Sequence, residues 1–308
     1  MEEELNTTYL ILGGHMELQK YRYLCFVFVF IMYILILCSN STIVYLIWKH
    51  QDLHEPMYIF IAALLVNSIL FTTNIYPKLL IDFLSEKQII SYQDCLVQYY
   101  MLYSLGGSEF LLLTAMAYDR YVSICKPLQY PTIMRKRTVS IFLTLAWLLP
   151  ACQFVGLTIM SSNQKLCSFT LKNLKARSVF GVVALIITVP LPVLFILFTY
   201  TRILIISFRS RRNVRRKAAQ TCLPHLLVLI SFTCLGAFDV IIVRLGSDFP
   251  KTVHFTITLQ TILCHPLFNP IIYGLKMKEI SKHLKKLYLS KKDQGVQDGR
   301  CECQSFEE

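Results

Sequence analysis

Long apolar stretches alternate with short polar segments along the whole chain. A helix that crosses a bilayer needs roughly 20 mostly apolar residues, and seven stretches approach or exceed this length, with ends that are defined only to within a few residues. They run over Tyr21–Trp48, Pro56–Leu80, Cys95–Tyr121, Thr138–Ile159, Val179–Phe208, Ala218–Leu245 and Val253–Leu275. The pattern predicts an all-α membrane protein, folded as a bundle of seven transmembrane helices.

The composition of the chain supports this interpretation. Hydrophobic residues make up 55% of the 308 positions and charged residues 16%, which is too apolar for a soluble globular domain. The net charge of +12 would suggest nucleic-acid binding in a soluble protein. Here the basic residues lie in short segments between apolar spans, so they indicate membrane topology and attraction to an anionic leaflet, and no nucleic-acid partner is expected.

Basic residues gather after the third and fifth spans and again after the seventh. They are Arg135, Lys136, Arg137, Arg209, Arg211, Arg212, Arg215, Arg216, Lys217, Lys276, Lys278, Lys282, Lys285 and Lys286. By the positive-inside rule these segments lie in the cytoplasm, which puts the N-terminus outside the cell and the C-terminus inside. The segment after the fourth span, with Lys165, Lys172, Lys175 and Arg177, opposes the rule but carries fewer charges.

The two ends of the chain differ in character. Residues 1–19 are polar and acidic and lack the features of a signal peptide, and the sequon at Asn6 is glycosylated only if this end is extracellular. In Lys276–Leu289, lysines alternate with apolar residues at helical spacing, which predicts a short amphipathic helix on the inner leaflet. We therefore expect one transmembrane domain over residues 1–290 and a disordered cytoplasmic tail over 291–308.

The sequence disfavours several classes of function. The cysteines lie mostly inside apolar spans and show no zinc-type spacing, so neither a metal nor a cofactor is expected. His225 and His265 are isolated on different spans, which disfavours an enzyme with clustered catalytic groups. A transporter would show internal repeats and a channel would show a repeated polar stripe or filter, and the sequence has neither.

Five sequence motifs occur in order on successive spans. They are Asn40 in the first span, Leu53–Tyr58 (LHEPMY) opening the second, Met116–Tyr130 (MAYDRYVSICKPLQY) closing the third, Lys217–His225 opening the sixth and Asn269–Tyr273 (NPIIY) closing the seventh. Together they resemble the vertebrate odorant receptors, a branch of the rhodopsin-like G-protein-coupled receptors. The phrases LHEPMYIFIAALL and TCLPHLLVLISF are most similar to the fish-like class of these receptors. The resemblance covers nearly the whole chain, except both termini and much of the segment after the fourth span.

This resemblance implies a plasma-membrane receptor that binds a small odorant between the outer halves of its spans. The bound odorant would stabilise a state whose inner surface activates the olfactory stimulatory G protein and, through it, adenylyl cyclase. An alternative within the same family is a chemosensory receptor that is expressed outside the olfactory tissue.

The resemblance also implies a G-protein-coupling switch at the inner ends of the third and seventh spans. Its residues would be Asp119, Arg120, Tyr121, Asn269, Pro270 and Tyr273. Arg120 is a permanent cation at a membrane–water boundary, where an isolated charge is costly. We expect it to pair with Asp119 and with the inner end of the sixth span in the silent state, and to be released on activation. Pro270 interrupts the helical hydrogen-bond ladder, which lets Tyr273 turn inward.

Glu109 is an acid in the middle of a span, so a functional role is the default expectation. In the receptors that the chain resembles, this acid stands beside an aspartate of the second span, and together they can hold a sodium ion. Ser68 occupies the position of that aspartate here, which removes one carboxylate and weakens the case for sodium. Glu109 is then expected to be protonated or hydrogen-bonded.

The resemblance places Cys95 at the position of a cysteine that is bridged to the segment after the fourth span. In this chain that segment, 160–177, contains Cys167 as its single cysteine, so Cys95–Cys167 is the expected disulfide. Cys167 stands where the first cysteine of this segment falls in the family, whereas the usual partner position lies near Ala176.

For the ligand pocket, the resemblance points to the outer halves of the third, fifth, sixth and seventh spans. Candidate lining residues are Leu102, Tyr103, Gly106, Gly107, Asp239, Val243, Arg244, Phe255 and Leu259. Arg244 matches an arginine that binds the ligand's carboxylate in acid-binding relatives, and the alternatives are a snorkelling side chain or an ion pair with Asp248. Asp239 would hold an amine ligand or face a protein partner such as His254.

Overall fold

The computed structural model describes residues 9–11, 21–85, 89–163, 190–209, 222–231, 233–234, 251–287 and 289. The elements in order are β1 (Tyr9–Ile11), α1 (Arg22–Lys49), η2 (Gln51–Leu53), α2 (Pro56–Leu84), β2 (Ile89–Ser91), α3 (Tyr92–Cys125), η3 (Pro127–Gln129), α4 (Tyr130–Ile133), α5 (Lys136–Asn163), α7 (Pro190–Arg209) and α9 (Lys251–Lys276). Further helical segments occupy Cys222–Ser231 and 278–287. Each of the seven predicted spans thus contains a described helix.

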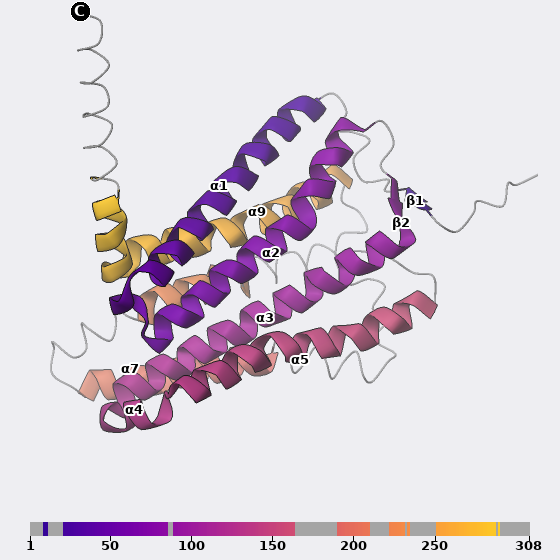
Figure 1. The fold of residues 1–308 in the computed structure, drawn as a ribbon. Helices are drawn as coiled ribbons and strands as arrows, with labels where there is room; N and C mark the ends of the chain where they lie inside the picture. Colours follow the sequence, from indigo (N-terminus) through magenta and orange to yellow (C-terminus); the bar gives the residue numbers. More distant parts are fainter. Residues whose placement is uncertain are drawn as a thin grey trace, which may run out of the picture.

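The long helices run side by side as a bundle (Figure 1). Its centre is α3, because this helix packs against α2 and also against α5 and α7. On the other side of α2, α1 and α9 contact each other as well as α2. Polar groups on α3 can therefore reach partners on several neighbouring helices.

The outer surface of the bundle is apolar. Among the described helices, Arg22–Lys49, Pro56–Leu84 and Lys136–Gly156 are long and apolar enough to cross a membrane. Large apolar side chains point away from the interior, and Leu24 is 69% and Leu194 is 66% exposed. Such a surface suits contact with lipid chains rather than with water.

The helices extend beyond the apolar stretches from which they were predicted. The second ends at Leu84, and the third begins at Tyr92 and continues to Cys125. Ser91 caps α3, since its side chain accepts a hydrogen bond from the backbone N–H of Asp94. A cap of this kind satisfies one of the free N–H groups of the first turn, so polar residues ahead of Cys95 join the helix.

A short antiparallel strand pair joins the N-terminal segment to the start of α3. β1 pairs with β2 in the register Tyr9↔Ser91, Leu10↔Ile90 and Ile11↔Ile89. These strands were not predicted, because a run of three residues is too short to show an alternating pattern. The pair places residues 9–11 at the end of the bundle where α3 begins (Figure 1).

Buried apolar side chains form one large cluster and smaller ones. The large cluster gathers around α3 and includes Leu112, Met116 and, from α9, Tyr273. A smaller cluster joins α1, α2 and α9 and includes Ile36 and Tyr76. Both clusters bring together helices that are far apart in the sequence.

The helical segment 278–287 packs on the end of the bundle. Ile280 is fully buried and belongs to the large apolar cluster. Leu284 packs against the same cluster, and its Cδ1 atom lies beside Gly274 close to Ile43 of α1. The apolar side of this segment is therefore held by the helix bundle itself.

Candidate functional site

Asp119 and Arg120 form a contact near the end of α3. The carboxylate of Asp119 is fully buried and accepts a hydrogen bond at 3.0 Å from the Arg120 Nε atom, with a second from an amino group of the same guanidinium. Its other oxygen accepts a hydrogen bond at 2.8 Å from the hydroxyl of Tyr130 in α4. Both carboxylate oxygens thus have donors, as a buried charge requires.

Tyr130 was part of the motif in the sequence, but no role was predicted for it. Burial, together with the nearby Asp119 carboxylate, raises the pKa of the Tyr130 phenol, so the hydroxyl keeps its proton and donates it. This donor links the short helix after α3 to the end of α3. Tyr121, the third residue of the predicted switch, is half-buried and packs against the large apolar cluster.

The second partner predicted for Arg120 was the inner end of the sixth span. Residues 210–221 lie outside the described part of the chain, so this contact stays a prediction. The described part of that span, Cys222–Ser231, begins with a buried cysteine in the large apolar cluster.

Asn269 joins α2, α3 and α9 in the middle of the bundle. Its Nδ2 atom donates hydrogen bonds to the Ser68 Oγ atom at 2.9 Å and to the Glu109 Oε1 atom at 3.1 Å. All three side chains are at most 4% exposed. The structure therefore brings together the two residues that were predicted as a weakened ion site and one residue that was predicted for the switch. It also supplies the hydrogen bond that was expected for Glu109.

Ser68 holds its place through a further contact, because its Oγ atom donates to the backbone carbonyl of Leu64 one turn earlier at 3.1 Å. The hydroxyl proton of Ser68 is thus directed along α2, and a lone pair of its Oγ atom faces the amide of Asn269. A cation at this cluster would find oxygen atoms from Ser68 and Glu109, and of these two residues Glu109 alone carries a carboxylate.

Tyr273 of α9 points into the bundle and is fully buried. Its hydroxyl lies 3.2 Å from the His225 Nδ1 atom and 3.9 Å from the Met116 sulfur. His225 was expected to stand apart from other His, Asp and Glu side chains, and the structure gives it Tyr273 as a partner, because the helix Cys222–Ser231 brings it against α9. One sequence signal was available, since His225 closes the motif that opens the sixth span.

Pro270 lies between Asn269 and Tyr273 inside α9 and is buried. A proline at this point removes one backbone donor from the helix. Asn269 and Tyr273 are four residues apart on α9, so they share one face of the helix and lie one above the other.

At the other end of α3, Tyr103 is surrounded by aromatic rings. Its ring is stacked on Phe154 of α5 with centroids 5.6 Å apart, and it is tilted against Tyr99 at 4.7 Å. Gly106 lies about one turn further along α3. Apart from its chain neighbours and the backbone of its own helix, no atom of the described residues lies within 4 Å of the place where a Cβ atom would stand on Gly106, whereas Gly107 is buried. The aromatic side chains could line one wall of a pocket, and the space beside Gly106 could admit a small ligand.

Several predicted residues lie outside the described part of the chain. They are Asn6, Cys167, Asp239, Val243 and Arg244. Phe255 belongs to α9 (Lys251–Lys276), but its side chain is not among those described. Cys95 is buried and takes part in a disulfide bond, and the bond's other half also lies outside the described residues.

The geometry defines a helical membrane bundle in which polar contacts connect the middle of the core to one end. A family model for olfactory receptors matches residues 28–291. Human (Homo sapiens) olfactory receptor 11G2 is 33% identical over 290 residues, which cover 86% of this chain and 81% of the relative. Human olfactory receptor 13C2 is 32% identical over 297 residues, covering 90% and 92%, and human olfactory receptor 52A5 is 30% identical over 279 residues, covering 85% and 88%.

The chain belongs to the olfactory receptor family. It is therefore a multi-pass plasma-membrane receptor that binds odorants and couples to a G protein, and it is not an enzyme. Membership in the family also implies the seven-helix transmembrane bundle that the sequence pattern predicted. The resemblance to the fish-like class stays a prediction.

Proposed function

We propose that this receptor takes up its odorant at the end of the bundle that carries Tyr103 and Gly106, and signals to an olfactory stimulatory G protein at the end that carries Asp119 and Arg120. The N-terminus is extracellular and the C-terminus cytoplasmic. Residues 1–290 form the receptor domain, and 291–308 form a cytoplasmic tail. The basic segments after the third, fifth and seventh spans support this orientation.

One observation carries the proposal. Polar side chains in the otherwise apolar core connect α2, α3, α9 and the helix Cys222–Ser231 through the Asn269 hydrogen bonds and the His225–Tyr273 contact. Further along α3 stands the ion pair of Asp119 with Arg120. A helix that shifts in response to a ligand must break these hydrogen bonds and form others. The core is therefore expected to switch between two discrete arrangements rather than to deform continuously.

In this mechanism the odorant binds more tightly to the state in which the inner end is open. It shifts the equilibrium only by its differential affinity for the two states. Arg120 leaves Asp119 when the sixth span moves outward, while Asn269, Pro270 and Tyr273 rearrange with the seventh span. The G protein then binds the exposed surface.

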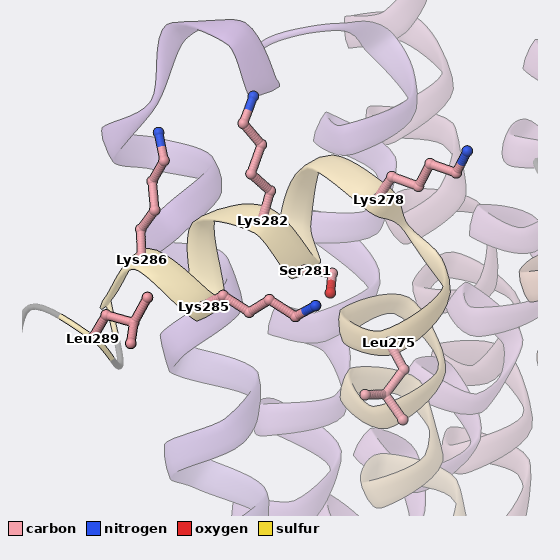
Figure 2. A pocket seen from close by; sticks show the side chains of 7 residues that line it. All are labelled: Leu275, Lys278, Ser281, Lys282, Lys285, Lys286 and Leu289. Atoms are coloured by element: carbon pink, nitrogen blue, oxygen red, sulfur yellow. The ribbon is translucent and has the colours of Figure 1, made fainter. Parts of the chain in front are cut away.

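We place the segment after α9 on the inner leaflet. Figure 2 shows the side chains of Lys278, Lys282, Lys285 and Lys286 extending from this helix, around a surface hollow that Leu275 and Leu289 also line. Leu275 is 71% exposed and Leu289 is 57% exposed. Lysines and apolar side chains at one surface match the boundary between anionic headgroups and acyl chains.

Two covalent features belong to the same proposal. Cys95 is joined to Cys167, which fastens the segment after the fourth span to the start of α3, and its bonded state supports this pairing. Asn6 carries an N-linked glycan, because the proposed orientation exposes it outside the cell.

For the ligand we propose a small carboxylic acid held by Arg244. Replacing Arg244 by Ala is then expected to abolish cyclic-AMP responses to a panel of short carboxylic acids while leaving surface expression unchanged, because the guanidinium provides the bidentate partner of the carboxylate. Responses to a matched panel of alcohols, measured in the same cells, serve as the internal reference. Lys251→Ala removes another cation, at the start of α9 and seven residues further along the chain, and is the control variant.

Equal activation of the Arg244→Ala variant and the parent by the acids would disprove the assignment. A loss that extends equally to the alcohols would also count against it, because an arginine that only supports the fold would affect both panels.

A further inference from the structure

Two histidines and an aspartate meet at the end of the bundle that carries Asp119. They are His50 and Asp52, between α1 and α2, and His283, in the segment after α9. One ligand atom from each lies within 4.8 Å of the corresponding atoms of the other two. The odorant and G-protein sites described above do not use these residues.

The contacts within this cluster are direct. The His283 Nε2 atom lies 2.8 Å from the Asp52 Oδ2 atom. The rings of His50 and His283 are stacked, with centroids 3.9 Å apart and an angle of 27° between their planes. Three donor groups from two distant parts of the sequence thus share one small volume.

The backbone holds these donors in place. His50 caps the end of α1 through a hydrogen bond from its N–H to the carbonyl of Leu46 at 3.1 Å. The turn η2 carries Asp52, and the next residue, Leu53, is fully buried in the core. His283 is 8% exposed and is flanked on its helix by the buried Ile280. A site needs such fixed ligands to bind an ion without a large ordering cost.

We propose that His50, Asp52 and His283 form a binding site for a divalent transition-metal ion such as zinc. Two imidazoles and one carboxylate are a ligand set that zinc accepts, whereas magnesium and calcium prefer oxygen ligands alone. Ligand atoms on one tetrahedral zinc lie roughly 3.4 Å apart. Rotation of the imidazole rings out of their stacked arrangement would place all three donors around an ion.

Asp52 also leaves room for the fourth ligand. Its side chain is 54% exposed, so a water molecule can complete a tetrahedral site from the solvent side. The ring nitrogen of His283 that faces Asp52 would bind the ion through its lone pair. The bound ion would clamp the segment after α9 to the connection between α1 and α2.

No sequence pattern indicated this site. His50 and Asp52 are two residues apart, but His283 lies 231 residues beyond Asp52. Spacing rules for metal ligands detect donors that are close in sequence, and the expectation of no metal rested on such spacing. The docking of the helix 278–287 on α1 is what brings the third donor into reach.

The test uses the purified full-length receptor in detergent, with zinc chloride as the probe and magnesium chloride as the reference. Zinc is expected to raise the thermal unfolding temperature of the parent, because an ion that binds the folded state alone stabilises it, and magnesium is expected to have no effect. Asp52→Asn, His50→Gln and His283→Gln are each expected to weaken zinc binding by about tenfold or more.

His54→Gln is the matched control. This histidine belongs to the same connection, but its ring faces the backbone carbonyl of Trp48 at 3.2 Å, so its variant should respond to zinc like the parent. Asp52 is exposed, so Asp52→Asn decides the question even if His283→Gln fails to fold. Equal zinc responses of the parent and the folded variants would overturn the proposal.

Cobalt substitution separates this site from the cysteines of the chain. Cobalt bound by two imidazoles and a carboxylate gives weak visible bands, whereas thiolate ligands give a strong near-ultraviolet charge-transfer band. The parent is expected to show the visible bands and Asp52→Asn to lose them. Visible bands of equal intensity in both proteins would contradict the assignment.

Discussion

Replacing Arg120 by Ala is expected to reduce the maximal odorant-stimulated cyclic-AMP response by about tenfold or more. The guanidinium is the cation that neutralises the fully buried Asp119 carboxylate in this structure. In the proposed active state the same group faces the G protein. The variant therefore lacks the partner that both states use, and the coupling between odorant and G protein is lost.

Two further variants show whether this effect is specific. Arg120→Lys keeps the charge but loses the forked geometry that donates two hydrogen bonds to one carboxylate, so an intermediate response is expected. Arg137→Ala removes an exposed cation from the start of α5 and should behave like the parent. A normal response from Arg120→Ala, at equal surface expression, would refute the role of Arg120 in the switch.

Replacing Asn269 by Ala is expected to destabilise the receptor by about 1–3 kcal/mol. The change removes the amide that donates to both Ser68 and Glu109, and it leaves the Glu109 carboxyl buried without that donor. The measurement is the thermal unfolding temperature of the purified receptor, together with its surface expression. Gln260→Ala is the control, because it removes an exposed amide from the same helix.

A double-mutant cycle assigns the effect of Asn269 to its contact. If the hydrogen bond to Glu109 is responsible, Glu109→Ala combined with Asn269→Ala will cost clearly less than the sum of the two single changes. Strict additivity of the two single changes would show that Asn269 acts elsewhere. An Asn269→Ala receptor that is as stable as the parent would contradict the network altogether.

The approximate positions of the seven apolar spans, and the motifs that close the third and seventh spans, were predictable because each depends on local sequence. Hydropathy alone placed the first helix at Tyr21–Trp48, and the structure has it at Arg22–Lys49. The polar ends of α3 were missed, because a cap such as Ser91 extends a helix into residues that an apolar pattern ignores.

Contacts between distant segments were harder to predict. Glu109 and Asn269 were assigned to separate functions, yet they share a hydrogen bond across 160 positions of sequence. His225 was considered isolated until the packing of its helix brought it against Tyr273. A single sequence shows which residues are unusual for a membrane span, but the pairing of helices in three dimensions decides which of these residues meet.

In the proposed mechanism, odorant and G protein act at opposite ends of a bundle whose termini lie on opposite sides of the membrane. Epitope tags on both ends of the full-length receptor test this in living cells by antibody staining before and after permeabilisation. We expect the N-terminal tag to stain on intact cells and the C-terminal tag to stain only after permeabilisation, because basic segments remain in the cytoplasm. Staining of both tags on intact cells, or of neither, would contradict the account.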